Sequence, residues 1–165
     1  MSEDEINPYF ADPEPHPNPA LGCIRRGLCC RTNPGWFAPG EVEKLIDWWN
    51  LRAEARGEPT VEPRELIRQF LIIDWLEIEG ERIDVFAPVK LARDGLPLEP
   101  PASRATGLYG RLKGRCVFFD DAAGCTIYAA RPFECRAYDC TNHPDDNPTH
   151  RSIAMMWKEA ADEEA

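Results

Sequence analysis

Residues 116–140 read CVFFDDAAGCTIYAARPFECRAYDC and contain four of the seven cysteines of the chain. Their spacing, C-x8-C-x9-C-x4-C, matches neither the C-x2-C pairs of common zinc fingers nor the C-x2-C-x2-C run of bacterial ferredoxins. The other three cysteines lie near the N-terminus, and residues 31–115 contain none. If both groups serve one site, the fold must bring distant thiols together. We name them the first packet (Cys23, Cys29, Cys30) and the second packet (Cys116, Cys125, Cys135, Cys140).

Cysteine thiolates are typical ligands of zinc, copper(I) and iron–sulfur clusters, and four ligands complete either a tetrahedral site or a cluster. We therefore predict that the cysteines of both packets are metal ligands. Seven thiols fill one such site and leave three over, so a second site would need at least one ligand of another kind. Each candidate for that ligand is equally typical of a solvated loop: His143, His150, Asp120 and Asp139.

Length and composition indicate one small domain. The chain has 165 residues, enough for a single core but too few to expect two domains. With 43% hydrophobic and 29% charged residues, it resembles ordinary globular proteins rather than disordered ones. Residues 1–21 contain five prolines, four of them at every second position from Pro13 to Pro19, and we expect these residues to form an extended arm. We predict that residues 22–165 form one α+β domain around the cysteine cluster.

Charge and hydropathy indicate where in the cell the protein is located and which kinds of partner it binds. The net charge of −10 repels a nucleic-acid backbone, and no apolar run approaches the length of a membrane span. Acidic residues near Met1 and the absence of an apolar stretch after them argue against a secretory signal. We therefore expect a cytoplasmic protein with reduced thiols, partnered by a metal and open to a protein partner, with no nucleic acid and no membrane.

Hydrophobic periodicity predicts helices followed by a hairpin in the middle of the chain. A helix is expected over residues 39–56, ending at Gly57, and a second, short helix capped by Thr60. A hairpin turning at Glu79-Gly80 follows, and then a long ordered loop over residues 87–115. The buried stripe of the first helix is Val42, Leu45, Ile46 and Trp49, and the hairpin alternation is Ile73, Trp75, Ile78, Ile83 and Val85.

The second packet is expected on a hairpin and a short helix. Residues 116–119 and 125–128 are predicted strands, which would present Cys116 and Cys125 near one another. Arg131-Pro132 opens a helical or turn segment holding Cys135 and Cys140. A final helix, capped by Thr149, is predicted to place Ile153, Met156, Trp157 and Ala160 on one face.

Arginines accompany the thiols in both packets. Positive charge beside a cysteine favours the thiolate and helps to balance a metal–thiolate centre. The alternative is that these arginines are ordinary solvated surface residues. The six within four positions of a cysteine are Arg25, Arg26, Arg31, Arg115, Arg131 and Arg136.

The motifs of both packets resemble one known family. Residues 23–31, CIRRGLCCR, and residues 124–140, GCTIYAARPFECRAYDC, are similar to the signature segments of the YkgJ-type cysteine-cluster family of zinc- or iron-chelating proteins. That family is named for a C-x2-C-x2-C-C motif. The resemblance implies a metal-binding domain, with an iron–sulfur cluster or a zinc or iron ion as cofactor. It further implies that Arg131 and Arg136 orient the cysteine-bearing turn while Ile127 and Tyr128 shield it; alternatively, Arg131 pairs with a carboxylate and Tyr128 fills the core.

One position departs from the family pattern. The second cysteine of the motif falls at position 26, where this chain has Arg26, so seven of the eight family cysteines remain. If the family uses all eight thiols at two centres, one centre is damaged here. If it uses four, Arg26 replaces a dispensable thiol.

The functional hypotheses therefore centre on the thiols. The first is a metal-binding protein that holds an iron–sulfur cluster or a zinc or iron ion, with a redox or cofactor-assisted role. The second is a non-enzymatic structural or interaction module in which zinc replaces part of a hydrophobic core. A thiol-redox protein is the third. Whether the chain is an enzyme stays open, because no catalytic base is evident beside a cysteine nucleophile.

Overall fold

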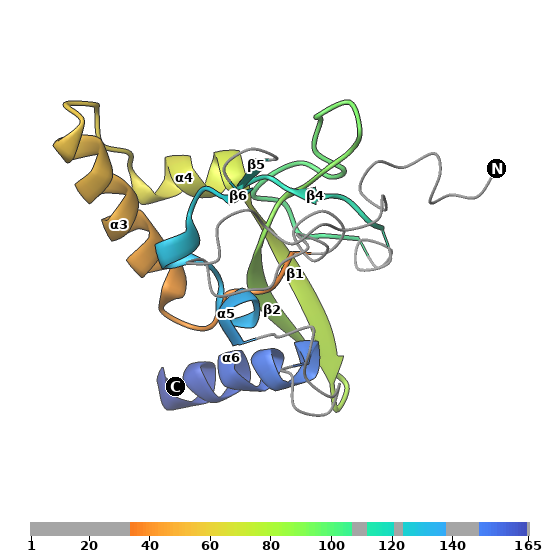
Figure 1. Cartoon of the computed structure of the whole chain (residues 1–165). Coiled ribbons are helices and arrows are strands. Elements are labelled where there is room, and N and C mark those ends of the chain that lie inside the picture. Colours follow the sequence, from red (N-terminus) through yellow and green to blue (C-terminus); the bar gives the residue numbers. More distant parts are fainter. Residues whose placement is uncertain (1–33, 107–111, 121–123, 138–148, 165) are drawn as a thin grey trace.

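A computed structural model describes residues 34–106, 112–120, 124–137 and 149–164. In this part of the chain two helices come first, three antiparallel strand pairs follow, and two further helices come last, which confirms the small α+β fold (Figure 1). The helices are α3 Glu41–Ala55, α4 Pro63–Phe70, α5 Phe133–Ala137 and α6 His150–Glu164, with a 3-10 turn η4 at Tyr128–Ala130. The strand pairs are β1 Leu71–Ile78 with β2 Glu81–Pro88, β3 Lys90–Leu91 with β4 Arg115–Cys116, and β5 Phe119–Asp120 with β6 Gly124–Cys125. The predicted arm, residues 1–21, lies outside the described residues.

The β1–β2 hairpin is the longest strand pair among the described residues. It turns at Glu79 and Gly80, whose φ angles of 53° and 81° are those of a type I′ turn, as predicted from the sequence. Its inner face packs against α6, which crosses the hairpin in Figure 1. The predicted alternation was correct for Ile78, Ile83 and Val85, which are buried. Ile73 and Trp75 are only half-buried, because the register pairs them with Phe86 and Asp84 on the opposite face.

Helices α3 and α4 build a second apolar cluster near the other end of the hairpin (Figure 1). The stripe predicted for α3 is correct at Val42, Leu45 and Ile46, which are buried. The helix ends where expected, followed by Gly57 at a φ of 69°. The predicted cap of α4 at Thr60 is wrong. The helix begins at Pro63 after Glu62, without a side-chain cap, because proline needs no hydrogen-bond acceptor at the first helical position.

The strands of the second packet differ from the prediction. The expected strand at residues 116–119 is divided between two partners: β4 pairs with β3, whereas β5 pairs with β6. The division occurs because the Val117 amide donates to the Val89 carbonyl, while the Phe118 carbonyl accepts from the Thr126 amide. After β6 the chain enters η4 instead of the predicted strand. Strand β3 likewise interrupts the loop expected over residues 87–115.

Helix α6 has the predicted cap and a different buried face. The Ser152 amide donates to Thr149 Oγ1 at 3.1 Å, and the Thr149 amide donates to Ser152 Oγ at 2.9 Å. Ile153 is fully buried, as expected, but Met156 is 36% exposed, so its prediction was wrong. Ala154 is buried instead, because the hairpin contacts that side of the helix.

Candidate metal centre

Three of the seven cysteines lie among the described residues. Cys116 is buried on β4, whereas Cys125 on β6 and Cys135 on α5 are half-buried, and none of the three forms a disulfide. Within the described residues, no three histidine, cysteine, aspartate or glutamate side chains converge on a position that could hold a metal ion. A complete thiolate centre would therefore need ligands from the rest of the chain. The other predicted ligands, Cys23, Cys29, Cys30 and Cys140, lie outside the described residues.

A short buried segment that follows the first packet in the sequence packs against the helix that carries Cys135. We call residues 34–38, with the sequence Pro-Gly-Trp-Phe-Ala, the central segment; it begins four positions after Cys30, and all five residues are buried. A Cβ atom at Gly35 would lie 3.0 Å from Cys135 Sγ, 3.0 Å from Cys135 N and 2.8 Å from Glu134 Cβ. The central segment therefore approaches α5 so closely that only glycine fits without displacement of its neighbours.

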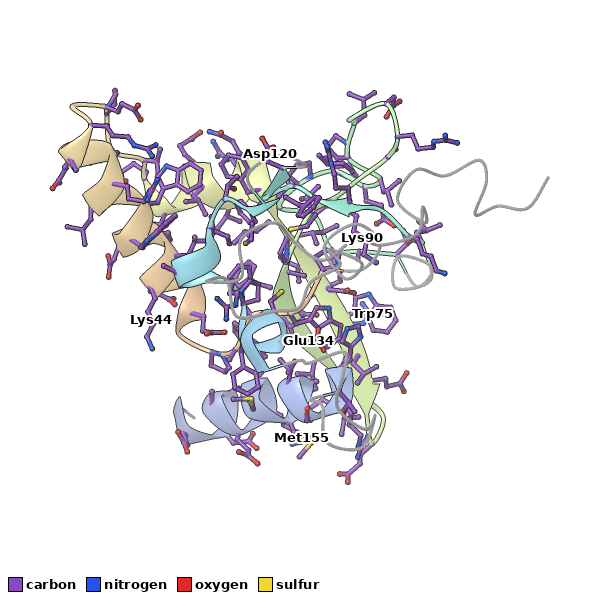
Figure 2. All side chains as sticks on the ribbon, viewed as in Figure 1. Lys44, Trp75, Lys90, Asp120, Glu134 and Met155 are labelled. Carbon is purple, nitrogen blue, oxygen red and sulfur yellow. The ribbon has the colours of Figure 1, made fainter. Side chains whose placement is uncertain are left out.

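Hydrogen bonds of the residues that follow Gly35 fix this approach. The Trp36 amide donates to Glu134 Oε1 at 2.9 Å, and the Glu134 amide donates to the Trp36 carbonyl at 3.3 Å. From α3, Glu41 Oε1 accepts from the Ala38 amide at 2.7 Å and from the Phe133 amide at 2.8 Å. Figure 2 shows Glu134 in the interior beside α5, whereas Lys44 of α3 points into solvent. The central segment and α5 are thus joined by paired main-chain and carboxylate contacts.

His150, a candidate ligand from the sequence, takes part in the same network. Its Nε2 lies 3.2 Å from Glu134 Oε1, and its ring stacks on Trp36 with centroids 3.9 Å apart. These contacts link the start of α6 to the Glu134 side chain. Of the other candidates, Asp120 is exposed on β5, and His143 and Asp139 lie outside the described residues.

Asp74 and Lys90 are two buried ionisable side chains that interact electrostatically. Asp74 accepts hydrogen bonds from the Trp36 indole at 3.1 Å and from the Trp75 amide at 2.9 Å. Burial raises the pKa of the Asp74 carboxyl, and these two bonds and the charge of Lys90 oppose that rise. Burial also lowers the pKa of Lys90, whose Nζ donates to the Leu112 carbonyl at 2.9 Å. Lys90 is paired with Cys116 in the β3–β4 register.

Cys125 packs against the second apolar cluster. Burial raises the pKa of its thiol, while a hydrogen bond from the Ile127 backbone and the positive charge of Arg131 act in the opposite direction. Ile127 itself is almost completely buried in the second apolar cluster. Arg131 therefore has the electrostatic effect expected of an arginine beside a thiol. The side chains of Tyr128 and Arg136 lie outside what the structure describes.

Comparison with known protein families identifies the domain. A family model named CxxCxxCC, described as "Putative zinc- or iron-chelating domain", matches residues 22–154. The chain belongs to this family. The match spans both cysteine packets and confirms the resemblance predicted from their motifs. No curated protein and no solved structure matched the chain significantly. Membership of the CxxCxxCC family supports metal binding in general, with zinc and iron as the named metals.

The CxxCxxCC domain contains several site residues that sequence reasoning missed. Gly35, Glu41, Asp74 and Glu134 were not predicted as site residues. Two local signals were present: Glu134 directly precedes Cys135, and Asp74 interrupts a strand of apolar residues. The contacts of these residues connect distant parts of the sequence, which spacing rules do not detect.

In the described part of this family member, no helix is long and apolar enough to cross a membrane.

Proposed function

We propose that this chain binds one metal centre, an iron–sulfur cluster or a zinc or iron ion, through thiolates of both packets. The centre would form where the central segment meets α5, with Cys135 as one ligand. The contact between Gly35 and Cys135 carries this proposal, because it joins the chain next to the first packet to a thiol of the second. The proposal also keeps the predicted cytoplasmic location, where thiols stay reduced and available to metals.

The covalent reach of the chain supports a shared centre. Cys30 precedes Gly35 by five positions, and Cys140 follows Cys135 by the same number. Five residues span at most about 18 Å when fully extended. Thiols of both packets are therefore tethered within a short distance of Cys135. The test of the proposal includes which of these thiols complete the set of four.

The donor chemistry fits such a centre. Cys135 forms no disulfide and lies half-buried against the central segment, and Arg131 supplies positive charge near Cys125. A thiolate set with nearby cations suits zinc, iron and iron–sulfur clusters. When bound, an iron–sulfur cluster would supply one-electron redox chemistry, and a zinc ion would supply folding free energy. The residues described here would orient the thiols and shield them from water.

One observation favours a second candidate, a zinc-stabilised structural module without redox chemistry. The junction of α5 and the central segment is held by buried hydrogen bonds, so a metal there would tie together two parts of the chain that are distant in sequence. Structural zinc sites act in this way. This candidate shares the ligands of the first and differs from it in the metal.

Anaerobic purification with metal and sulfide analysis separates these candidates. A cluster would give iron, acid-labile sulfide and broad visible absorption, whereas a structural site would give zinc and no colour. Cys135→Ser should abolish metal loading in either case. Val42→Thr, an isosteric polar change in the second apolar cluster, provides a control that destabilises the core without removing a thiol. A native chain free of metal, with disulfides by mass spectrometry, would replace both candidates with the thiol-redox alternative.

A further inference from the structure

Two buried carboxyl groups connect the central segment to α5. Glu41 comes from α3 and is 6% exposed, and Glu134 comes from α5 and is 9% exposed. Buried carboxyl groups are costly unless hydrogen bonds compensate for the lost hydration. Here both groups accept main-chain donors from the same junction. We infer that Glu41 and Glu134 are positioning residues of the metal centre, an inference that rests on the proposed function.

Glu41 joins three elements through a single oxygen atom. Its Oε1 accepts from Ala38, the last residue of the central segment, and from Phe133, the first residue of α5. These two amides are more than ninety positions apart in the sequence. The carboxyl group bridges them by accepting a hydrogen bond from each. Removing it would leave two main-chain donors without this acceptor at the junction.

Glu134 acts next to the thiol itself. It accepts from the Trp36 amide, and its own amide donates to the Trp36 carbonyl, so the two residues are held in both directions. Gly35 precedes Trp36 directly, and Cys135 follows Glu134 directly. The pair of hydrogen bonds therefore sets the position of Cys135 relative to the chain that leads back to the first packet. His150, 3.2 Å from Glu134 Oε1, supports the carboxyl group from α6.

The chemistry of these contacts explains why carboxyl groups suit the position. A carboxyl group has two acceptor oxygens and can therefore accept several main-chain hydrogen bonds. They hold the two chain segments in one geometry, which apolar packing alone specifies less sharply. A thiolate centre assembled from distant packets needs such a fixed geometry, because its ligands must converge within a few tenths of an ångström. Groups that orient metal ligands typically contribute about 10- to 100-fold to metal affinity.

Titration of cobalt(II) into the reduced, metal-free, full-length chain tests this inference. Absorption from thiolate-to-cobalt charge transfer reports ligation by sulfur, and chelator competition gives the affinity. We expect Glu134→Ala and Glu41→Ala to weaken cobalt binding about 10- to 100-fold. Glu134→Gln and Glu41→Gln keep an acceptor oxygen, so their losses should be smaller than those of the alanine variants.

A matched control separates positioning from general loss of stability. Asp74→Ala removes another buried carboxyl group that bonds Trp36, but the hydrogen bonds of Asp74 are with Trp36 and Trp75 and not with α5. Urea unfolding of each metal-free variant measures how much stability it has lost. At a similar loss of stability, Asp74→Ala should bind cobalt(II) more tightly than Glu134→Ala. Equal losses in the two variants, or native affinity in Glu134→Ala, would overturn the inference.

The two proposals fail in different ways. If the native chain shows no thiolate-to-cobalt absorption and also contains no zinc, iron or sulfide after anaerobic purification, the proposed metal centre is wrong and the positioning role falls with it. If the native chain binds cobalt(II) through sulfur and the glutamate variants bind equally well, only the positioning role is wrong.

Discussion

Gly35 and Cys135 are in direct contact although they are far apart in the sequence. A Cβ atom at Gly35 would approach Cys135 Sγ to 3.0 Å and Glu134 Cβ to 2.8 Å. Neither neighbour can yield freely, because Glu134 is bonded to Trp36 through both its main chain and its side chain. The position of the second packet's helix is therefore coupled to the chain that follows the first packet.

Gly35→Ala should damage both stability and metal binding. The added methyl group overpacks the junction, and such changes typically cost about 1–3 kcal/mol of unfolding free energy. Urea unfolding of the metal-free protein and metal content after purification would measure the two effects. Gly95→Ala is the control: it strains a backbone with a φ of 85°, but nothing lies within 4 Å of the added atom. It should lower stability and leave metal content unchanged. Full loading of Gly35→Ala would contradict the importance of this contact.

The raised pKa of Asp74 predicts a pH-dependent effect of Asp74→Asn. Burial raises the pKa of this carboxyl above its ordinary value of 3.8, so the folded state binds the proton more tightly than the unfolded state. The resulting stabilisation is fully present below pH 3.8 and is lost as the pH rises through the folded-state pKa. The asparagine variant cannot ionise and avoids this loss. Its stability relative to the native chain should therefore increase as the pH rises over that window.

Urea unfolding of the metal-free chain at a series of pH values measures this difference. Asparagine offers one acceptor where aspartate offers two, so a constant cost will shift the whole curve, and the slope is the quantity of interest. A flat or falling difference for Asp74→Asn would show that folding does not raise the pKa of the Asp74 carboxyl.

Arg131→Ala should make Cys125 less reactive. The charge of Arg131 opposes the effect of burial on the pKa of the Cys125 thiol, so its removal should raise that pKa further. The thiolate fraction would fall at any pH below the pKa, and iodoacetamide would react more slowly with Cys125. Peptide mass spectrometry of the metal-free chain measures this rate. Arg151→Ala, at an exposed position on α6, should leave the rate unchanged. An unchanged or faster rate in Arg131→Ala would argue against this electrostatic role.

Trp157→Phe should loosen the connection between α6 and the central segment. The Trp157 indole donates to the Phe37 carbonyl at 2.7 Å. Phenylalanine keeps an aromatic ring at this position but has no N–H group to donate. Loss of one partner of such a hydrogen bond typically costs about 1–3 kcal/mol. Trp48→Phe is a suitable control, because the Trp48 ring contacts Arg52 within α3. Equal unfolding free energies for the two variants would contradict a special role for the Trp157 donor.

Local patterns predicted the helices and the central hairpin well. The stripe of α3, the Glu79-Gly80 turn and the Thr149 cap each depend on residues a few positions apart, where spacing and side-chain chemistry decide the outcome. The errors arose where distant strands compete. Cys116 pairs with Lys90 rather than with the strand of Cys125, and no local rule selects that partner.

The candidate site was predictable only as a set of thiols. The cysteine motifs identified the family. The residues whose hydrogen bonds hold the central segment against α5 are not cysteines. Glu41 reaches Phe133 and Glu134 reaches Trp36 across most of the chain. Such contacts follow from packing of whole elements, which composition and periodicity do not specify.

Differential alkylation of the metal-loaded chain tests the central claim most directly. Accessible thiols are labelled with one reagent in the presence of the metal, the metal is removed, and the newly exposed thiols are labelled with a second. Mass spectrometry then identifies the cysteines that the metal protected. In the native chain we expect the metal to protect Cys135 together with at least one of Cys23, Cys29 and Cys30. In the Cys135→Ser variant we expect protection to be lost in both packets. Protection confined to one packet, or none at all, would contradict a centre shared between them.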